Sequence, residues 1–345
     1  MKKPLKIAII TVSVILGVVI IALSGFAALN NMGKLQFHKN DKNISGDNIT
    51  EDNNGILYKN ERYELNDDII SFLFIGVDKG NVGDNFGAGL NGQADTLLVV
   101  AVNTKTRNVT VIPISRETLV DVNQYTISGD YSGVANKQIC LAYSYGTTIE
   151  KSSENVLLSV SRVLYGINIG SYITMDLAAL EKISDAVGYV EVYVNEDYYD
   201  RDFGTYYKSG QTIKVKGKSA VNYIHWRTDD VDSNNYRMER QKSFMTAFMN
   251  KVGNSVSEDF SKVITYYNMM QPYVSTNISL SQTTYLATNC MKFDLGDSIN
   301  FKSIPGKTFT REGYSAFTPD DDALTDIVVE TFYKKIPKKT DESKK

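Results

Sequence analysis

An uncharged run of 23 residues, Ile7 to Leu29, lies near the start of this 345-residue chain and limits how the rest can fold. As an α-helix the run would measure about 35 Å, enough to cross a hydrocarbon core of roughly 30 Å. Lys2, Lys3 and Lys6 precede it. The positive-inside rule then predicts a cytoplasmic N-terminus over residues 1–6 and an extracellular remainder. We therefore expect a single-pass anchor in the cell membrane over residues 7–29.

A cleavable signal peptide is the alternative explanation, because small residues near Ala27 and Ala28 could precede a cleavage site. The apolar region of a signal peptide spans about 7–15 residues, however, and this run is longer. A retained anchor is the interpretation that we favour.

The chain beyond the anchor has about 310 residues, enough for one large domain or two small ones. Residues 30–68 are rich in Asn, Asp, Lys and Gly, which predicts a flexible extracellular tether, and residues 336–345 are typical of a polar tail. The net charge of −3, with no basic stretch among aromatic residues, gives no sign of a nucleic-acid partner. We expect the folded domain over residues 69–335.

Short apolar strands alternate with amphipathic helices through this part of the chain. Ile69–Val77 predicts a buried strand with Asp78 at its C-terminal tip, and Thr96–Asn103 and Asn108–Ser115 predict two more. Further strands are expected at Ser171–Met175, Tyr189–Val194 and Phe301–Ile304, and residues 210–224 predict a turn, a short strand and the start of a helix. Helices are expected at Glu154–Tyr165, Asp176–Val187, 235–252, Asp259–Met270, Ser281–Met291 and Asp320–Tyr333. The alternation, without an internal repeat, indicates an α/β fold with a mixed central β-sheet between helical layers.

Three arginines and a glutamine gather at Arg227, Arg237, Arg240 and Gln241. In a helix starting near Asn235, Arg237 and Gln241 lie at i and i+4 on one face, with Arg240 beside them. The planar fork of a guanidinium suits paired phosphate oxygens, so the cluster indicates an oxyanion clamp. A solvated helix face balanced by nearby Asp and Glu residues is the alternative, and this segment alone does not separate the two.

Two carboxylates, Asp78 and Asp95, flank a loop rich in Gly and Asn, and Arg116 ends a strand that follows. Magnesium typically takes one or two carboxylates plus phosphate oxygens. Taken singly, each of these residues could cap a strand or form a surface ion pair. Together with the arginine cluster they outline a metal–diphosphate site of the kind that phosphoryl transfer requires.

The sequence lacks the motifs of several other enzyme classes: it has no Walker-type loop, no HExxH, no paired CxxC and no nucleophile elbow. A Ser-His-Asp apparatus would have to use His225, which has no evident serine partner. Cys140 and Cys290 are the only cysteines. They could form a disulfide outside the membrane or could be two buried small side chains, and the sequence leaves both possibilities open.

In their order along the chain, these motifs resemble the LytR–CpsA–Psr (LCP) family, the cell-wall glycopolymer ligases of Gram-positive bacteria. The resemblance covers about residues 69–335. Its motifs are Phe74–Asp78, Ala94–Thr96, Ile114–Thr118, Ala142–Gly146, Asp185–Gly188, the lead-in Gly217, Ala220 and Tyr223, and the spacing of Arg227, Asp230, Arg237, Arg240 and Gln241.

The resemblance implies an LCP-like α-β-α fold and a Mg²⁺-dependent phosphotransferase. In that reaction a glycopolymer such as teichoic acid or capsular polysaccharide passes from a polyprenyl-pyrophosphate carrier to a peptidoglycan hydroxyl, and polyprenyl phosphate leaves. By position, the resemblance implies Asp78 and Asp95 as ligands of Mg²⁺ or Mn²⁺, Asp95, Arg116 and Arg237 as catalytic residues, and Arg116, Arg227, Arg237, Arg240 and Gln241 as the diphosphate-binding set. The resemblance assigns no oligomeric state.

Several positions depart from the family pattern. The family often has Arg where Gln93 and His225 stand, and Asp where Glu117 stands. Two positively charged side chains that the family often has are therefore missing, and their absence could alter substrate choice or slow the reaction. A non-catalytic module that binds wall polymer or anionic lipid, and a polyprenyl-pyrophosphate hydrolase, are the competing hypotheses.

Overall fold

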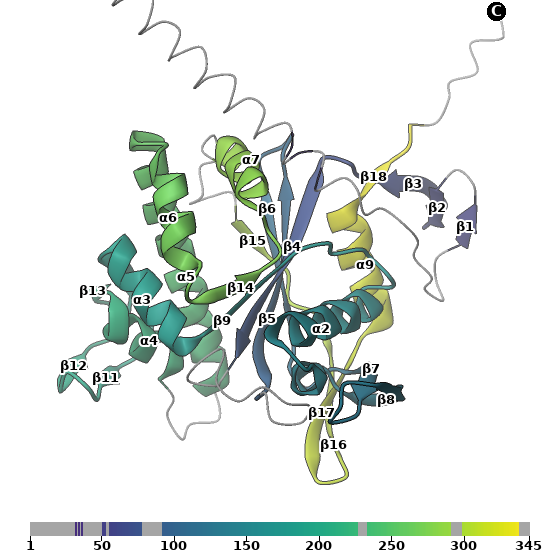
Figure 1. Cartoon of the computed structure of the whole chain (residues 1–345), viewed down its shortest axis with the longest axis horizontal. Coiled ribbons are helices and arrows are strands. Elements are labelled where there is room, and N and C mark those ends of the chain that lie inside the picture. Colours follow the sequence, from purple (N-terminus) through teal and green to yellow (C-terminus); the bar gives the residue numbers. More distant parts are fainter. Residues whose placement is uncertain are drawn as a thin grey trace, which may run out of the picture.

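A six-stranded mixed sheet forms the centre of the computed structural model, which describes residues 32, 34, 36, 50–52, 55–77, 92–226, 233–290 and 299–337 (Figure 1). In spatial order its strands are β14 (Val274–Thr276), β9 (Tyr172–Asp176), β4 (Ile69–Val77), β5 (Ala94–Asn103), β6 (Val109–Ile114) and β15 (Ile299–Phe301). The β4–β9 and β6–β15 pairs are parallel, and the other pairs are antiparallel. The mixed central sheet predicted from the sequence is confirmed.

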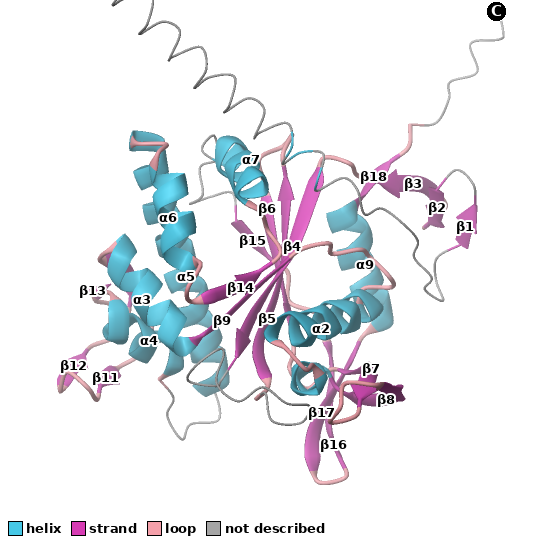
Figure 2. Cartoon of the chain, in the orientation of Figure 1, coloured by secondary structure: helices cyan, strands magenta, loops and turns pink. Residues whose placement is uncertain are grey.

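Helices lie on both sides of this sheet, as Figure 2 shows. They are α2 (Ile149–Val163), α3 (Leu177–Val187), α4 (Gly217–His225), α5 (Ser233–Glu258), α6 (Lys262–Met270), α7 (Leu280–Cys290) and α9 (Asp321–Phe332), with a short 3₁₀ helix, η2 (Ile139–Tyr145). The helices expected at these places are confirmed, with ends that differ by a few residues. Side-chain caps fix the starts of α2, α3 and α9, because Thr148 accepts from the Lys151 amide, Asp176 from the Ala179 amide and Asp320 from the Ala323 amide.

Alternating side chains of the central strands pack against different helices. On one face, inward residues of β4, β5 and β6 such as Leu73 and Val99 share a buried cluster with Val160 of α2 and Val328 of α9. On the other face, Val100 belongs to a second cluster, against which Met249 of α5 packs. This period of two places a helical layer on each face of the sheet.

The predicted tether is wrong in part, because residues 55–65 belong to the folded domain. They form β2 (Gly55–Tyr58) and β3 (Glu61–Leu65), in one sheet with β1 (Thr50–Asp52) and β18 (Tyr333–Lys335). The Ile336 amide donates to the Arg62 carbonyl at 2.8 Å, so the start of the predicted polar tail is also attached. Of the side chains in β2 and β3, Ile56 alone is buried in the core, which explains why composition indicated a tether.

Four two-stranded pieces complete the described fold, and among their strands the sequence predicted β10 and, as a short strand within residues 210–224, β13. They are β10 (Val190–Tyr193) with β13 (Thr212–Val215), β11 (Tyr198–Asp200) with β12 (Thr205–Tyr207), β7 (Leu119–Tyr125) with β8 (Tyr131–Gln138), and β16 (Gly306–Arg311) with β17 (Tyr314–Pro319). The β16–β17 hairpin projects from the body of the protein (Figure 1). Its base is joined to the turn after β6, because the Phe317 amide donates to the Glu117 carbonyl at 2.9 Å.

The predicted anchor, residues 7–29, lies outside the described residues. In the part of the chain that the structure describes, no helix is both long enough and apolar enough to cross a membrane.

The contact between α3 and α4 depends on a glycine. Gly217 starts α4 with a φ of +50°, and its amide donates to the Ser184 hydroxyl at 3.1 Å. A Cβ at this position would lie 2.3 Å from Oδ1 of Asp185, so the backbone conformation favours glycine and a larger residue would have to displace the exposed Asp185 carboxylate.

We expect Gly217→Ala to lower the free energy of unfolding more than Gly204→Ala does. Gly204 also has a positive φ, +61°, but nothing lies within 4 Å of a Cβ there. The control should therefore lose only about 1–2 kcal/mol for the left-handed backbone. Displacing the Asp185 side chain from its rotamer should add about 0.5–1.5 kcal/mol at Gly217. Urea denaturation measures both, and equal losses would show that α3 and α4 are not in tight contact there.

Candidate active site

The register of the central sheet brings Asp95 and Arg116 together. Strand β5 pairs antiparallel with β6 so that Leu97 lies opposite Ile114. Continuing that register by two residues along each strand places Asp95 opposite Arg116. On its other side β5 pairs with β4, where Val77 lies opposite Ala94. The register therefore directs the acidic Asp95 and the basic Arg116 to one end of the sheet.

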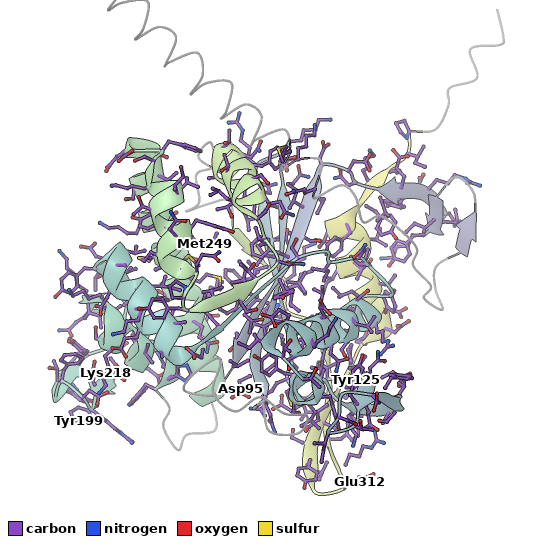
Figure 3. All side chains as sticks on the ribbon, viewed as in Figure 1. Asp95, Tyr125, Tyr199, Lys218, Met249 and Glu312 are labelled. Carbon is purple, nitrogen blue, oxygen red and sulfur yellow. The ribbon has the colours of Figure 1, made fainter. Side chains whose placement is uncertain are left out.

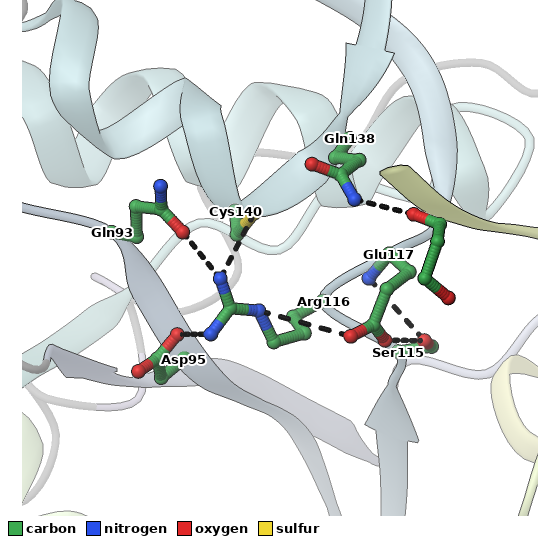
Figure 4. A network of polar contacts seen from close by, with 8 residues as sticks. Gln93, Asp95, Ser115, Arg116, Glu117, Gln138 and Cys140 are labelled. Carbon is green, nitrogen blue, oxygen red and sulfur yellow. Dashed lines mark hydrogen bonds and ion pairs between the residues drawn. The ribbon is translucent and has the colours of Figure 1, made fainter. Parts of the chain in front are cut away.

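Arg116 forms the centre of a polar network at this end (Figure 4). Its Nη1 donates to the Asp95 carboxylate and its Nη2 to the Gln93 side-chain carbonyl. Nη2 also lies 3.8 Å from Sγ of Cys140, and Nε lies 3.9 Å from Oε1 of Glu117. The side chains of Arg116 and Asp95 are 35% and 34% exposed, so an incoming ligand can reach both.

Cys140 is a free cysteine, and it lies buried beneath Arg116. The disulfide with Cys290 that the sequence left open is therefore not formed, and for Cys140 the alternative of a buried small side chain is confirmed. Burial raises the pKa of the Cys140 thiol, and the positive charge of Arg116 offsets only part of that shift. The thiol consequently stays protonated near neutral pH and is not a nucleophile in this resting state.

A tight turn, Ser115 to Thr118, fixes the backbone of Arg116. The Thr118 amide donates to the Ser115 carbonyl at 3.0 Å, and the Cys140 amide donates to the Arg116 carbonyl at 3.3 Å. The Ser115 hydroxyl donates to the Glu117 carboxylate at 2.9 Å. Glu117 is thus held mainly by Ser115, and it adds a second negative charge near the guanidinium.

The arginine cluster is described only in part. Asp78 and Arg227 lie outside the described residues, and Arg237 lies in α5 with its side chain outside them. Gln241 is half-buried and donates to the Ile224 carbonyl at 3.5 Å, near the end of α4.

Arg240 has a different environment from the one expected. Its side chain is 1% exposed, and its three guanidinium nitrogens donate to the Tyr223 carbonyl, the Glu196 carboxylate and the Trp226 carbonyl. A guanidinium enclosed in this way cannot contact a diphosphate without leaving these partners. The structure therefore does not support Arg240 as a diphosphate ligand, because protein groups surround it.

Among the described residues, no group of three or more His, Cys, Asp or Glu side chains is arranged to hold a metal ion. Asp95 nevertheless offers a suitable donor, since its partly exposed carboxylate is a hard oxygen ligand at the end of the sheet. In Figure 3 it lies at the end of the sheet nearest the β16–β17 hairpin.

Gln93, Cys140 and Glu196 contact the predicted residues but were not identified as their partners from the sequence. Gln93 carried a usable signal, because residues at i and i+2 of a strand face the same side and Gln93 precedes Asp95 by two. Cys140 and Glu196 are remote in sequence from the arginines that they contact, by 24 and 44 residues. No local pattern predicts such pairs.

Comparison with known proteins agrees with the fold. A crystal structure of TagV from B. subtilis is similar to this chain with a TM-score of 0.60 and 23% sequence identity, over 76% of this chain and 96% of that one. A structure described as TagT bound to LI-WTA has a TM-score of 0.55 and 19% identity, over 76% of this chain and 89% of that one. At these identities the likeness concerns the fold alone.

Two relatives carry names for an activity. The polyisoprenyl-teichoic acid–peptidoglycan teichoic acid transferase TagV of Bacillus subtilis (strain 168) is 26% identical over 76% of this chain and 62% of its own length. The transferase TagU of Enterococcus faecalis (strain ATCC 700802 / V583), named for the same activity, is 25% identical over 76% of this chain and 78% of its own. The chain thus spans less than two thirds of the Bacillus relative. The profile of the LytR_cpsA_psr family matches residues 31–332, nearly the whole chain, and the chain belongs to that family.

Proposed function

We propose that this protein transfers a phosphate-linked glycopolymer, a teichoic acid or a capsular polysaccharide, from a polyprenyl diphosphate to a hydroxyl of peptidoglycan. The observation that carries the proposal is the Asp95–Arg116 pair, which the β5–β6 register assembles at one accessible end of the sheet. Family membership and the names of the relatives support the same reaction. We further propose that residues 7–29 anchor the protein in the cell membrane, with the catalytic domain outside.

In the proposed reaction the acceptor oxygen forms a bond to the phosphorus that carries the polymer. The bond from that phosphorus to the bridging oxygen of the diphosphate breaks, and polyprenyl phosphate leaves with that oxygen. Arg116, with Arg227, Arg237 and Gln241, would bind the diphosphate oxygens and stabilise the charge that develops on them. Asp95 is our candidate to accept the proton of the acceptor hydroxyl.

Asp78 and Asp95 are the residues that would hold Mg²⁺ or Mn²⁺. What supports this pairing is that Val77, the last residue of β4, lies opposite Ala94, which is next to Asp95, and that Asp78 follows Val77 in the sequence. The cation would supply neutralising charge to the diphosphate.

Asp95→Asn and Arg116→Lys should each reduce transfer by about 10²-fold or more. The first removes a negative charge, and the second removes the bidentate contact that a guanidinium makes with the reacting phosphates. The measurement is the attachment of labelled polymer to peptidoglycan in the presence of Mg²⁺, together with released polyprenyl phosphate. Lys151→Ala is the control, since Lys151 pairs with Glu154 on the exposed side of α2.

Three results would contradict this function. Transfer by either variant within a few-fold of the unaltered protein would exclude the mechanism. Polymer bound without release of polyprenyl phosphate would identify a binding module. Free phosphorylated polymer, with none joined to glycan, would identify a hydrolase.

Arg116→Gln should bind Mn²⁺ more tightly than the unaltered protein. Arg116 pairs with the Asp95 carboxylate, so a cation must displace the guanidinium before it can use that ligand. Partly exposed pairs contribute about 0–1 kcal/mol, which corresponds to an affinity gain of up to about fivefold. Calorimetric titration with Mn²⁺ alone measures this, with Lys151→Gln as the control. Binding weaker than that of the unaltered protein would contradict competition between Arg116 and the cation for Asp95.

A further inference from the structure

Arg240 is the largest fully buried side chain of the described residues. Its Nε donates to the Tyr223 carbonyl at 2.9 Å, Nη1 donates to the Glu196 carboxylate, and Nη2 donates to the Trp226 carbonyl. The guanidinium also lies over the Trp226 ring, 5.2 Å from its centroid. Each of its three nitrogens therefore has a protein acceptor.

Two of these acceptors belong to the end of α4. The carbonyls in the last turn of a helix have no partner within the helix, and a cation near them is favourable. Tyr223 is in that last turn, and Trp226 is the C-cap residue, whose amide donates to the Asn222 carbonyl at 2.9 Å. Arg240 thus satisfies carbonyls of α4 from a position in α5.

Glu196 supplies the charge that allows this arginine to be buried. It lies in the segment between β10 and β11, with a side chain that is 15% exposed. An unpaired guanidinium in such a place would be strongly unfavourable, and the carboxylate compensates it. Glu196 and Arg240 therefore act as one unit that joins α4, α5 and the β10–β11 segment.

This unit holds the two places from which the proposed phosphate-binding arginines extend. Trp226, whose carbonyl it binds, is the residue before Arg227. Arg237 lies three residues before Arg240, close to one turn away in α5. The buried contacts of Arg240 therefore fix the distance between the backbone at Trp226 and the backbone of α5.

We infer that Arg240 is a positioning residue for diphosphate binding and not a ligand: paired with Glu196, it ties the end of α4 to α5. The inference rests on the proposed function. In this inference Arg240 positions Trp226 and α5, and other side chains contact the phosphates directly.

The test compares Glu196→Gln and Arg240→Lys in the full chain, with Lys242→Gln as the control on the same helix. Lys242 is exposed and lies over the Phe301 ring. The probe is geranyl diphosphate with Mg²⁺, titrated by calorimetry well below the melting temperature of each variant. Circular dichroism verifies that each variant is folded.

We expect Arg240→Lys to weaken binding about tenfold and Glu196→Gln about threefold, because a lysine cannot reach three acceptors and a neutral partner holds the guanidinium less firmly. The double variant should bind no more weakly than Arg240→Lys alone, since the two residues act as one unit. Lys242→Gln should bind as the unaltered protein does.

The sign of the Glu196→Gln effect separates the two roles. A direct ligand freed from its carboxylate partner would bind the diphosphate equally well or better, and that result would overturn the inference. A lower melting temperature with unchanged affinity would also overturn it, because it would mark a purely structural role. If Arg240→Lys does not fold, Glu196→Gln decides alone. Failure of the unaltered protein to bind the probe would instead refute the proposed function.

Discussion

The antiparallel pairing of β5 with both of its neighbours is the constraint on which the candidate site depends. Backbone hydrogen bonds fix which residues lie opposite one another, and a shift by one residue would turn every side chain to the other face. With Leu97 opposite Ile114, Asp95 and Arg116 converge at one end of the sheet. The buried alternate residues keep this register, because slipping it would expose the core. The packing of the sheet therefore determines the geometry of the site.

Two arginines illustrate how differently the same side chain is used. Arg116 lies at the end of the sheet among Asp95, Gln93 and Glu117, with a side chain that is about one-third exposed. Its partners are side chains that can exchange for a ligand at small energetic cost. Arg240 is enclosed, and two of its three partners are backbone carbonyls that cannot move away without opening α4. Exposure and the kind of acceptor, more than residue type, separate a binding arginine from a positioning one.

Much of the fold could be predicted because its strands and helices carry strong local signals. The run Ile69–Val77 became β4 with the predicted bounds, and Asp176 begins α3 as its N-cap. The sheet formed by β1, β2, β3 and β18 was missed. Those strands are polar, and β3 is stabilised by pairing with a segment about 270 residues away in sequence, which composition does not report. The β7–β8 and β16–β17 hairpins were missed for a similar reason, since few of their side chains are buried.

For the site, the sequence alone determined the residue types and their order, which identify the family and the chemistry that carboxylates and guanidinium groups can perform. It also placed Asp95 and Arg116 at strand ends, because apolar runs and the polar residues that end them are local properties. Only the tertiary structure decided the partners. Arg116 meets Cys140, and Arg240 meets Glu196, through contacts between segments that are distant along the chain. Burial depends on everything that packs around a side chain, so no pattern within one segment could distinguish the enclosed arginine from the open one.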